Sequence, residues 1–412
     1  MTSITRPALL LALALAVHAD TCPACTGGAC DCSWVQTGAC SGPGDGSCCF
    51  KCCCAPSAPT PPPAPRAPVP ALPPLNIDPA QISVSGISSG ADMAVQLQVA
   101  FSETFAGAAV FAGQAWHCAV FAFPNETLAP PDPKVPVCDG CPPGKTLTYD
   151  HCKNHPEVVR VPPLVQRARE AEAAGTIDAL ASLARRRIFL YRGTHDTCYN
   201  KGAVNATAEF FLGAGVAPRA VRFVNTVNST HLLPTVNKPL CDWESFDGCD
   251  FDGAGEALRW IHSKSAPLAP RVNDTRSTWT QLRKFDQTKF FGDKFAGFAS
   301  NASAFVPDEC LKSASTLAAP PCRLHVFLHG CGIHNYDGYN MFVNYSGFTN
   351  WAATNRFVVL FPSIDWGEAA TTNQERSGCF DGYGQTGADY DLRSGAQMTV
   401  IKRMVDAAVA GH

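Results

Sequence analysis

A glycine-flanked serine is the sequence feature best suited to chemistry. The segment Gly86-Ile87-Ser88-Ser89-Gly90 has the pattern G-x-S-x-G, and it stands between a strand-like run, Ile82 to Ser85, and a helical run, Ala91 to Phe101. In such a turn the two glycines permit the crowded backbone that lifts a serine hydroxyl above the edge of a sheet. The pattern therefore predicts Ser88 as a nucleophile. The alternative is a Gly/Ser turn without chemistry.

A serine hydroxyl is a poor nucleophile unless a histidine takes its proton and an acid orients that histidine. Asp196 follows the strand expected at Arg187 to Tyr191, and His231 follows the strand expected at Ala220 to Val227. The two residues are about one strand-crossover-strand unit apart, so both side chains can reach the same edge of a parallel sheet. We therefore expect Asp196 as the acid and His231 as the base. The alternative for Asp196 is an Asx turn.

A second motif follows later in the chain, where Leu324 to Leu328 is expected to be a buried strand that runs into His329-Gly330-Cys331. In α/β-hydrolases such a His-Gly loop supplies one backbone N–H of the oxyanion hole, and the residue after the nucleophile supplies the other. The predicted donors are thus the amides of Ser89 and Cys331. The alternative bases are His329, in this loop, and His195, beside the acid.

The order of these motifs is unusual for a hydrolase. The His-Gly strand ordinarily precedes the serine, but here it follows His231, as do the helix at Asn350 and the strand Phe357 to Phe361. A circular permutation explains this order, because a domain with close termini tolerates the rearrangement. The predicted fold class is therefore α/β, an α/β-hydrolase fold in circularly permuted order with a mainly parallel sheet.

The other expected elements alternate between strand and helix. The expected helices are Leu164 to Arg185, Ala206 to Leu212, Gly253 to His262, Phe348 to Thr354 and Ala396 to Ala408. The further expected strands are Ala108 to Phe111 and Cys322 to Leu328, with β structure at Trp279 to Phe291 and Ala304 to Val306.

The N-terminal part has a different composition. Residues 1–19 carry an apolar run that ends in a small-x-small cleavage signal, which predicts a signal peptide, with a membrane anchor as the alternative. Residues 20–54 hold ten Cys and predict a disulfide module, with a metal cluster as the alternative. Residues 55–74 hold ten Pro and predict a stiff linker. The catalytic domain is expected over 75–412.

The amino-acid composition indicates the cellular compartment and the classes of binding partner. The chain has 412 residues, 46% of them apolar and 16% charged, with a formal net charge of −3, which favours neither nucleic acid nor an acidic tail. Its 21 Cys indicate an oxidising, secretory route. Six N-x-S/T sequons agree with that route, at Asn125, Asn205, Asn228, Asn273, Asn301 and Asn344. We expect a secreted, extracellular monomer that does not bind a membrane.

Six motifs occur in one order along the chain, at Gly86–Ala94, Phe111–Gly113, Phe285–Phe291, Leu324–Cys331, Asn350–Asn355 and Gln397–Val405. Together they resemble a known family, the circularly permuted polyhydroxybutyrate depolymerases of fungi and bacteria. The resemblance implies a Ser88, Asp196 and His231 triad, with the amides of Ser89 and Cys331 as the oxyanion hole. It also implies acyl-enzyme hydrolysis of a short-chain polyester without a metal or an organic cofactor. The Cys-rich module lies outside the resemblance and could bind an insoluble polymer surface.

The chain departs from the family near its C-terminus. Where the family has a Trp-rich stretch after a Gly-Cys, this chain has Gly378 to Gly384 without Trp, which opens a carbohydrate esterase of feruloyl or acetyl-xylan type as an alternative. A non-catalytic binding protein on a hydrolase scaffold is the other alternative. Trp116 and Tyr383 are candidate substrate-stacking aromatics. The proximity of the motifs suggests a disulfide between Cys331 and Cys379.

Overall fold

The computed structural model describes residues 31–36, 50–55, 68–119, 149–238, 250–265, 267–313, 315–316, 318–333, 336–370 and 373–411. The chain divides into two units, Met1–Ala67 and Pro68–His412. In the first unit β1 (Asp31–Gln36) pairs antiparallel with β2 (Phe50–Ala55). The expected signal peptide and the disulfide pairing of the Cys-rich module lie outside the described residues.

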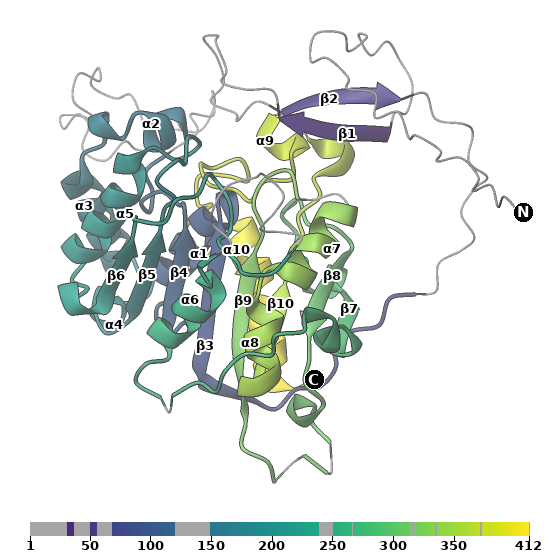
Figure 1. Cartoon of the computed structure of the whole chain (residues 1–412). Coiled ribbons are helices and arrows are strands. Elements are labelled where there is room, and N and C mark those ends of the chain that lie inside the picture. Colours follow the sequence, from purple (N-terminus) through teal and green to yellow (C-terminus); the bar gives the residue numbers. More distant parts are fainter. Residues whose placement is uncertain are drawn as a thin grey trace, which may run out of the picture. The chain divides into compact units, whose positions relative to one another are not determined.

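The second unit is built on an eight-stranded sheet in the order β6-β5-β4-β3-β9-β10-β8-β7 (Figure 1). Neighbouring strands are parallel from β6 to β10, whereas β8 is antiparallel to both β10 and β7. The strands are β3 (Ile77–Ile87), β4 (Gly107–Phe111), β5 (Arg187–Tyr191), β6 (Val221–Val224), β7 (Leu282–Asp286), β8 (Asn301–Phe305), β9 (Cys322–Leu328) and β10 (Phe357–Phe361).

Helices cover both faces of this sheet, so β4 and β10 are buried along their whole length. The helices are α1 (Ser89–Ala100), α2 (Tyr149–Asn154), α3 (Val161–Ala173), α4 (Leu180–Leu183), α5 (Lys201–Gly213), α6 (Gly253–Ile261), α7 (Tyr336–Tyr345), α8 (Phe348–Asn355), α9 (Asn373–Arg376) and α10 (Ala396–Ala410). None of the helices in the described ranges is long and apolar enough to cross a membrane.

The strand β10 illustrates how the two faces are filled. Val358 and Leu360 join the core beneath α1, α3, α5 and α10, whereas Phe357, Val359 and Phe361 join the core beneath α6, α7 and α8. This alternation follows the two-residue period of a strand. Figure 1 shows α6 and α8 on one face of the sheet and α10 on the other.

Most of the expected elements are present, and the strands predicted at Cys322–Leu328 and Phe357–Phe361 are confirmed with those bounds. The single helix expected over Leu164 to Arg185 was wrong. It is two helices, α3 and α4, because the chain turns at Gly175, which has a φ of 68°. That left-handed conformation ends a helix and suits glycine.

The continuous β structure expected over Trp279 to Phe291 was also wrong. Only β7 is a strand there, and short 3-10 turns lie on both sides of it, at Thr275–Gln281 and Gln287–Phe290. The carboxylates of Asp274 and Asp286 each accept a backbone N–H at the start of a turn. Such Asx contacts compete with strand pairing, and the aromatic residues of the segment gave no sign of them.

The last residues of the proline-rich segment pack onto the second unit. The carbonyl of Pro70 accepts the N–H of Asp286 at 2.8 Å, and that of Pro74 accepts the N–H of Lys312 at 2.9 Å. Leu72 between them is buried in the core. Residues 68–74 therefore form the entry into the second unit.

Candidate active site

The candidate nucleophile Ser88 stands in a sharp turn between β3 and α1. Its φ of 58° and ψ of −128° are rare for a residue with a side chain, and such strain persists where the surroundings enforce it. The backbone around Ser88 is closely packed. A Cβ on Gly86 would lie 2.1 Å from the Gly90 carbonyl oxygen, and a Cβ on Gly90 would lie 2.4 Å from the His329 carbonyl oxygen. The turn therefore requires both glycines of the motif.

The Ser88 side chain stands at the amino end of α1. The backbone carbonyl of Ser88 accepts the N–H groups of Ala91 and Asp92, and the backbone N–H of Ser88 donates to the Phe111 carbonyl at 3.0 Å. The hydroxyl makes no capping bond to the helix. The positive end of the helix dipole favours negative charge at this position, so the turn presents an oxygen where an alkoxide or oxyanion is stabilised.

The candidate acid and base are brought together by two loops that continue the pairing of β5 with β6. Beyond the ends of these strands, the N–H of Thr194 donates to the Val227 carbonyl at 2.9 Å, and that of His195 donates to the Ser229 carbonyl at 3.0 Å. Ser229 is further held by the Tyr191 hydroxyl, whose oxygen is 2.6 Å from Ser229 Oγ. The two loops therefore leave the carboxyl edge of the sheet side by side.

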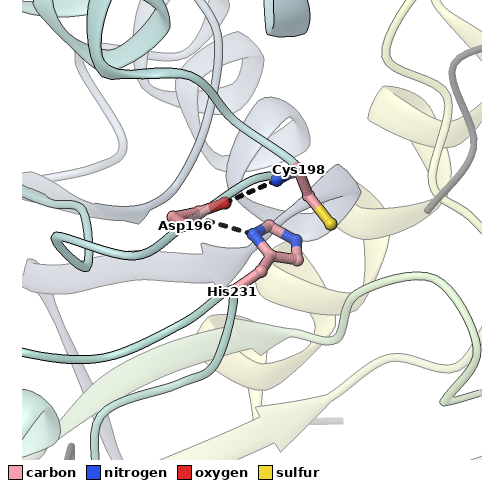
Figure 2. A group of neighbouring side chains, drawn as sticks. All are labelled: Asp196, Cys198 and His231. Atoms are coloured by element: carbon pink, nitrogen blue, oxygen red, sulfur yellow. Dashed lines mark hydrogen bonds and ion pairs between the residues drawn. The ribbon is translucent and has the colours of Figure 1, made fainter. Parts of the chain in front are cut away.

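At their tips the side chains of Asp196 and His231 meet, and Figure 2 shows this contact. His231 Nδ1 is 2.9 Å from Asp196 Oδ2, and Asp196 Oδ1 accepts the N–H groups of Cys198 and Tyr199, each at 2.9 Å. This contact fixes the proton of the neutral imidazole on Nδ1, so Nε2 is the nitrogen that can accept another proton.

The same contacts keep the Asp196 carboxyl ionised. Its burial would raise its pKa, but the nearby His231 and the two backbone N–H groups more than offset this, and the pKa lies below the ordinary value. Asp196 therefore remains an anion that can orient and stabilise a protonated His231.

The two alternative bases have different surroundings. His195 is exposed, and its Nδ1 lies 3.1 Å from the hydroxyl of the neighbouring Thr194. His329 is buried, with Nδ1 2.8 Å from the Gly330 carbonyl and Nε2 accepting the N–H of Ile364. Both nitrogens of His329 thus hold the backbone of the His-Gly loop.

The His-Gly loop lies directly beside the nucleophile turn. Leu328, the last residue of β9, pairs with Gly86 on β3, and a Cβ on Gly330 would lie 3.1 Å from the Ser88 Cβ. The predicted disulfide between Cys331 and Cys379 is confirmed. Among the described residues, the amides of Ser89 and Cys331 donate to no other group.

Asp196, Cys198 and His231 also form the kind of group that could hold a metal, since their potential ligand atoms lie within 4.8 Å of one another. Cys198, however, is in a disulfide, so it has no thiolate to offer. His231 Nδ1 is already engaged by Asp196. The group is therefore better described as an acid–base pair next to a disulfide.

Trp116 and Tyr383 are both buried, with exposed fractions of 1% and 6%. The Trp116 Nε1–H donates to the Asp391 carbonyl at 3.2 Å, and its ring packs against that of Phe210. The Tyr383 N–H donates to Asp381 Oδ1 at 3.1 Å. Both residues thus take part in packing, and neither ring presents an open face to solvent in this structure.

A second group of serine and histidine side chains, which sequence reasoning missed, lies within the sheet. Ser83 Oγ is 2.8 Å from His325 Nδ1 and 3.1 Å from His262 Nε2, and Ser85 Oγ is 2.7 Å from His325 Nε2. Burial lowers the pKa of His262 to about 3 and that of His325 well below its ordinary value. The group is closed to solvent, and Ser83, Ser85 and His325 lie on the strands rather than at their carboxyl ends, with His262 at the end of α6. It is therefore a structural network.

Tyr199 was also missed, although it contacts both Asp196 and His231. Its only sequence signal is its position three residues after Asp196, where its N–H can reach the carboxylate.

Two curated proteins are similar to this chain in sequence. The chain is 31% identical over 345 residues to a poly(3-hydroxybutyrate) depolymerase of Delftia acidovorans, a match that covers 82% of this chain and 62% of the relative. It is 28% identical over 360 residues to a polyhydroxybutyrate depolymerase of Talaromyces funiculosus, covering 83% of this chain and 93% of that one. The chain is therefore similar to two polyhydroxybutyrate depolymerases over most of its length. No family model matches it.

Solved structures of the polyhydroxybutyrate depolymerase family share the fold. The enzyme from Penicillium funiculosum superposes with a TM-score of 0.66 at 28% identity, over 83% of this chain and 99% of that one. A PHB depolymerase complexed with an R3HB trimer matches with the same values. These similarities show that the chain shares the fold of these depolymerases. The chain spans less than two thirds of the length of the Delftia relative, at 62%.

Proposed function

We propose that the chain is a secreted serine esterase that hydrolyses a short-chain polyester of the poly(3-hydroxybutyrate) type. The observation that carries the proposal is the contact of 2.9 Å between His231 Nδ1 and Asp196 Oδ2, at the same sheet edge as the strained turn of Ser88. A serine, a histidine and an acid in this relation activate a hydroxyl for acyl transfer. The names of the two relatives support the polyester substrate.

In the proposed reaction, His231 Nε2 takes the proton of Ser88 Oγ as this oxygen attacks the ester carbonyl carbon. The carbonyl oxygen becomes an oxyanion, and the amides of Ser89 and Cys331 stabilise it. The imidazolium then gives its proton to the alcohol that leaves, and Ser88 carries the acyl group. Water, deprotonated by His231, releases the acid and restores the hydroxyl of Ser88.

The two oxyanion donors are supported by their surroundings. Ser89 is the first residue of α1, so its N–H has no partner within the helix. The disulfide to Cys379 and the bond from the Gly332 N–H to the Ser377 carbonyl hold the loop that contains Cys331. Donors that are fixed before the reaction stabilise charge without reorganising.

Two further proposals concern the architecture and the compartment. We propose that the element order is a circular permutation, which is supported by the parallel pairing of β3 with β9 despite their distance along the chain. We also propose that the chain is secreted. The disulfides Cys118–Cys152, Cys310–Cys322 and Cys331–Cys379 support an oxidising compartment.

One observation favours a second candidate substrate. The segment from Gly378 to Gly384 lacks the tryptophans of the family. In their place Asp381, fully buried, accepts the N–H groups of Tyr383, Gly384 and Gln385 and organises a tight turn. If this segment lines the substrate cleft, its different side chains favour a different acyl or alcohol group. The alternative function is therefore a carbohydrate esterase of feruloyl or acetyl-xylan type.

The test compares wild type with Ser88→Ala for release of 3-hydroxybutyrate from a polyhydroxybutyrate suspension, with a soluble short-chain ester and feruloyl and acetyl-xylan substrates in parallel. Ser277→Ala, an exposed serine, is the matched control. Release by wild type and the control but not by Ser88→Ala supports the proposal. Turnover of the carbohydrate esters alone would contradict the polyester substrate and support the carbohydrate esterase. Activity retained by Ser88→Ala would exclude Ser88 as the nucleophile.

The role of the Cys-rich module needs a separate test. Because residues 68–74 pack onto the second unit, the deletion should remove residues 20–67 and keep Pro68 onward. If the module binds polymer, the shortened chain adsorbs less to the solid and turns over the soluble ester at the same rate. Equal adsorption by both forms would contradict that role.

A further inference from the structure

Tyr199 contacts both members of the acid–base pair. Its N–H donates to Asp196 Oδ1 at 2.9 Å, and its ring stacks on the imidazole of His231 with centroids 5.4 Å apart and planes 7° apart. The side chain is only 1% exposed. A parallel aromatic face restricts the tilt of the imidazole, and it attracts the ring when the ring is protonated.

The hydroxyl of Tyr199 reaches the helix of the nucleophile. It donates to Asp92 Oδ2 at 2.7 Å, while Asp92 Oδ1 accepts the N–H of Gln114 at 2.8 Å. Asp92 lies in the first turn of α1, and its own N–H donates to the carbonyl of Ser88 at 3.0 Å. Tyr199 is thus a short connection between the base and the helix that begins at the nucleophile.

The backbone of Tyr199 is fixed as well. Arg192 donates from Nε to the Tyr199 carbonyl at 2.9 Å and from a terminal nitrogen to the Asp196 carbonyl at 2.7 Å. The ammonium of Lys153 lies 6.0 Å from the centre of the Tyr199 ring. The charged groups near Tyr199 thus include Asp196 and Arg192 at its backbone, Asp92 at its hydroxyl and Lys153 near its ring.

We propose that Tyr199 is a positioning residue, which holds the plane of His231 by stacking and sets its place relative to Ser88 through Asp92. The inference rests on the proposed function, in which His231 takes the proton of Ser88. A base must stand within hydrogen-bond reach of the proton that it removes, and a small displacement costs a large factor in rate.

The test uses two variants of Tyr199. Tyr199→Phe keeps the stacked ring and loses the bond to Asp92, whereas Tyr199→Met fills the space without a planar ring. The matched control is Tyr390→Phe, which loses a buried hydroxyl that donates to the Ala119 carbonyl at 2.6 Å. The measurements are kcat and KM for a soluble short-chain ester, the rate at which diisopropyl fluorophosphate modifies Ser88, and Tm.

We expect Tyr199→Met to lower kcat by about 100-fold and Tyr199→Phe by about tenfold, because a misplaced base affects the chemical step. KM should stay within about twofold, because the proposal gives Tyr199 no contact with the substrate. The modification of Ser88 should slow in the same order as kcat, because it depends on the same base. Tyr390→Phe should lower Tm and leave kcat unchanged. A loss of stability alone does not produce this separation of kcat from KM in folded protein.

The proposal is overturned if Tyr199→Phe and Tyr199→Met, folded at the assay temperature, both keep the wild-type kcat, or if they lose equal factors. Should Tyr199→Met not fold, a wild-type kcat in Tyr199→Phe is sufficient to overturn it. Failure of the proposed function is distinguishable, because Ser88→Ala would then keep its activity whatever the Tyr199 variants do.

Discussion

Gly330 lies against Ser88, so that a Cβ on Gly330 would be 3.1 Å from the Ser88 Cβ and 3.3 Å from the Ile87 carbonyl oxygen. This contact joins the carboxyl ends of β9 and β3. It also explains why the second residue of the loop after β9 is a glycine, since any side chain there would occupy space next to the nucleophile. The loop can therefore bring the Cys331 amide close to the reacting atoms.

Gly330→Ala should reduce activity with little loss of stability. The added methyl group is tight against Ser88 and takes room that the attacked carbonyl needs, so we expect kcat/KM for a soluble ester to fall by about tenfold or more. Gly292→Ala is the control, because its Cβ would meet only the flexible end of Arg403. Unchanged kcat/KM in Gly330→Ala would contradict a reaction site between these two strands.

Asp196→Asn should remove most of the activity while the fold persists. An amide can present its NH₂ to His231 Nδ1 and so stabilise the wrong tautomer, and in a serine triad that change costs about 10⁴ in kcat. Kinetics with a soluble ester would measure it, with the exposed Asp308→Asn as control. A loss of less than tenfold would mean that another group orients the base.

The disulfide Cys331–Cys379 should matter for rate as well as for stability. It joins residues 48 apart, and its loss should lower the free energy of unfolding by about 2–4 kcal/mol. Because Cys331 supplies a proposed oxyanion donor, the double variant Cys331→Ser/Cys379→Ser should also have a lower kcat.

A second disulfide provides the comparison. Cys310–Cys322 lies at the opposite end of β9, and the double variant Cys310→Ser/Cys322→Ser should lose stability and keep its kcat. Denaturant unfolding and kinetics on both double variants would separate the two effects. Equal kcat values in the two would refute a role of the Cys331 loop in the reaction.

The buried histidines should make the fold sensitive to acid. The pKa of His262 is about 3 in the folded chain, against 6.5 for an ordinary histidine, so the unfolded state binds more protons as the pH falls. Stability is therefore complete above about pH 6.5 and is lost progressively between pH 6.5 and 3, by up to ~1.4 kcal/mol per pH unit. The lowered pKa of His325 acts in the same direction.

Denaturant unfolding at pH 7 and pH 5 would measure this dependence. Wild type should lose about 2 kcal/mol more than His262→Asn between these values, because the variant lacks one of the two titrating groups. His195→Asn, at an exposed position, should behave as wild type. An equal loss in wild type and His262→Asn would contradict the assignment of a buried neutral imidazole.

The positions of the candidate nucleophile, acid and base could be predicted because each follows a strand of the same parallel sheet. Ser88 follows β3, Asp196 follows β5 and His231 follows β6, so chain order and strand spacing placed them at one edge. The contact between Asp196 and His231 needed only that placement and two short loops.

What could not be predicted depends on contacts between distant segments. Tyr199 and Asp92 are 107 residues apart, and Ser83 and His325 are 242 apart, so no local pattern indicates either pair. The break at Gly175 shows the opposite failure, because the surrounding Ala, Glu and Arg residues have high helix propensity and a single left-handed residue outweighs them. Long-range contacts determine the first two pairs, and the left-handed backbone of Gly175 determines where the helix ends.

The pairing of β3 with β9 has a consequence for synthesis. The strand that leads to Ser88 is made early, but its sheet neighbour begins at Cys322 and the cysteine that anchors the next loop is Cys379. Pairings this distant in sequence form late, since a long stretch of chain must first be ordered. A polypeptide still attached to the ribosome would therefore carry an unassembled site, and the proposed ester cleavage would begin only when nearly the whole chain has been released.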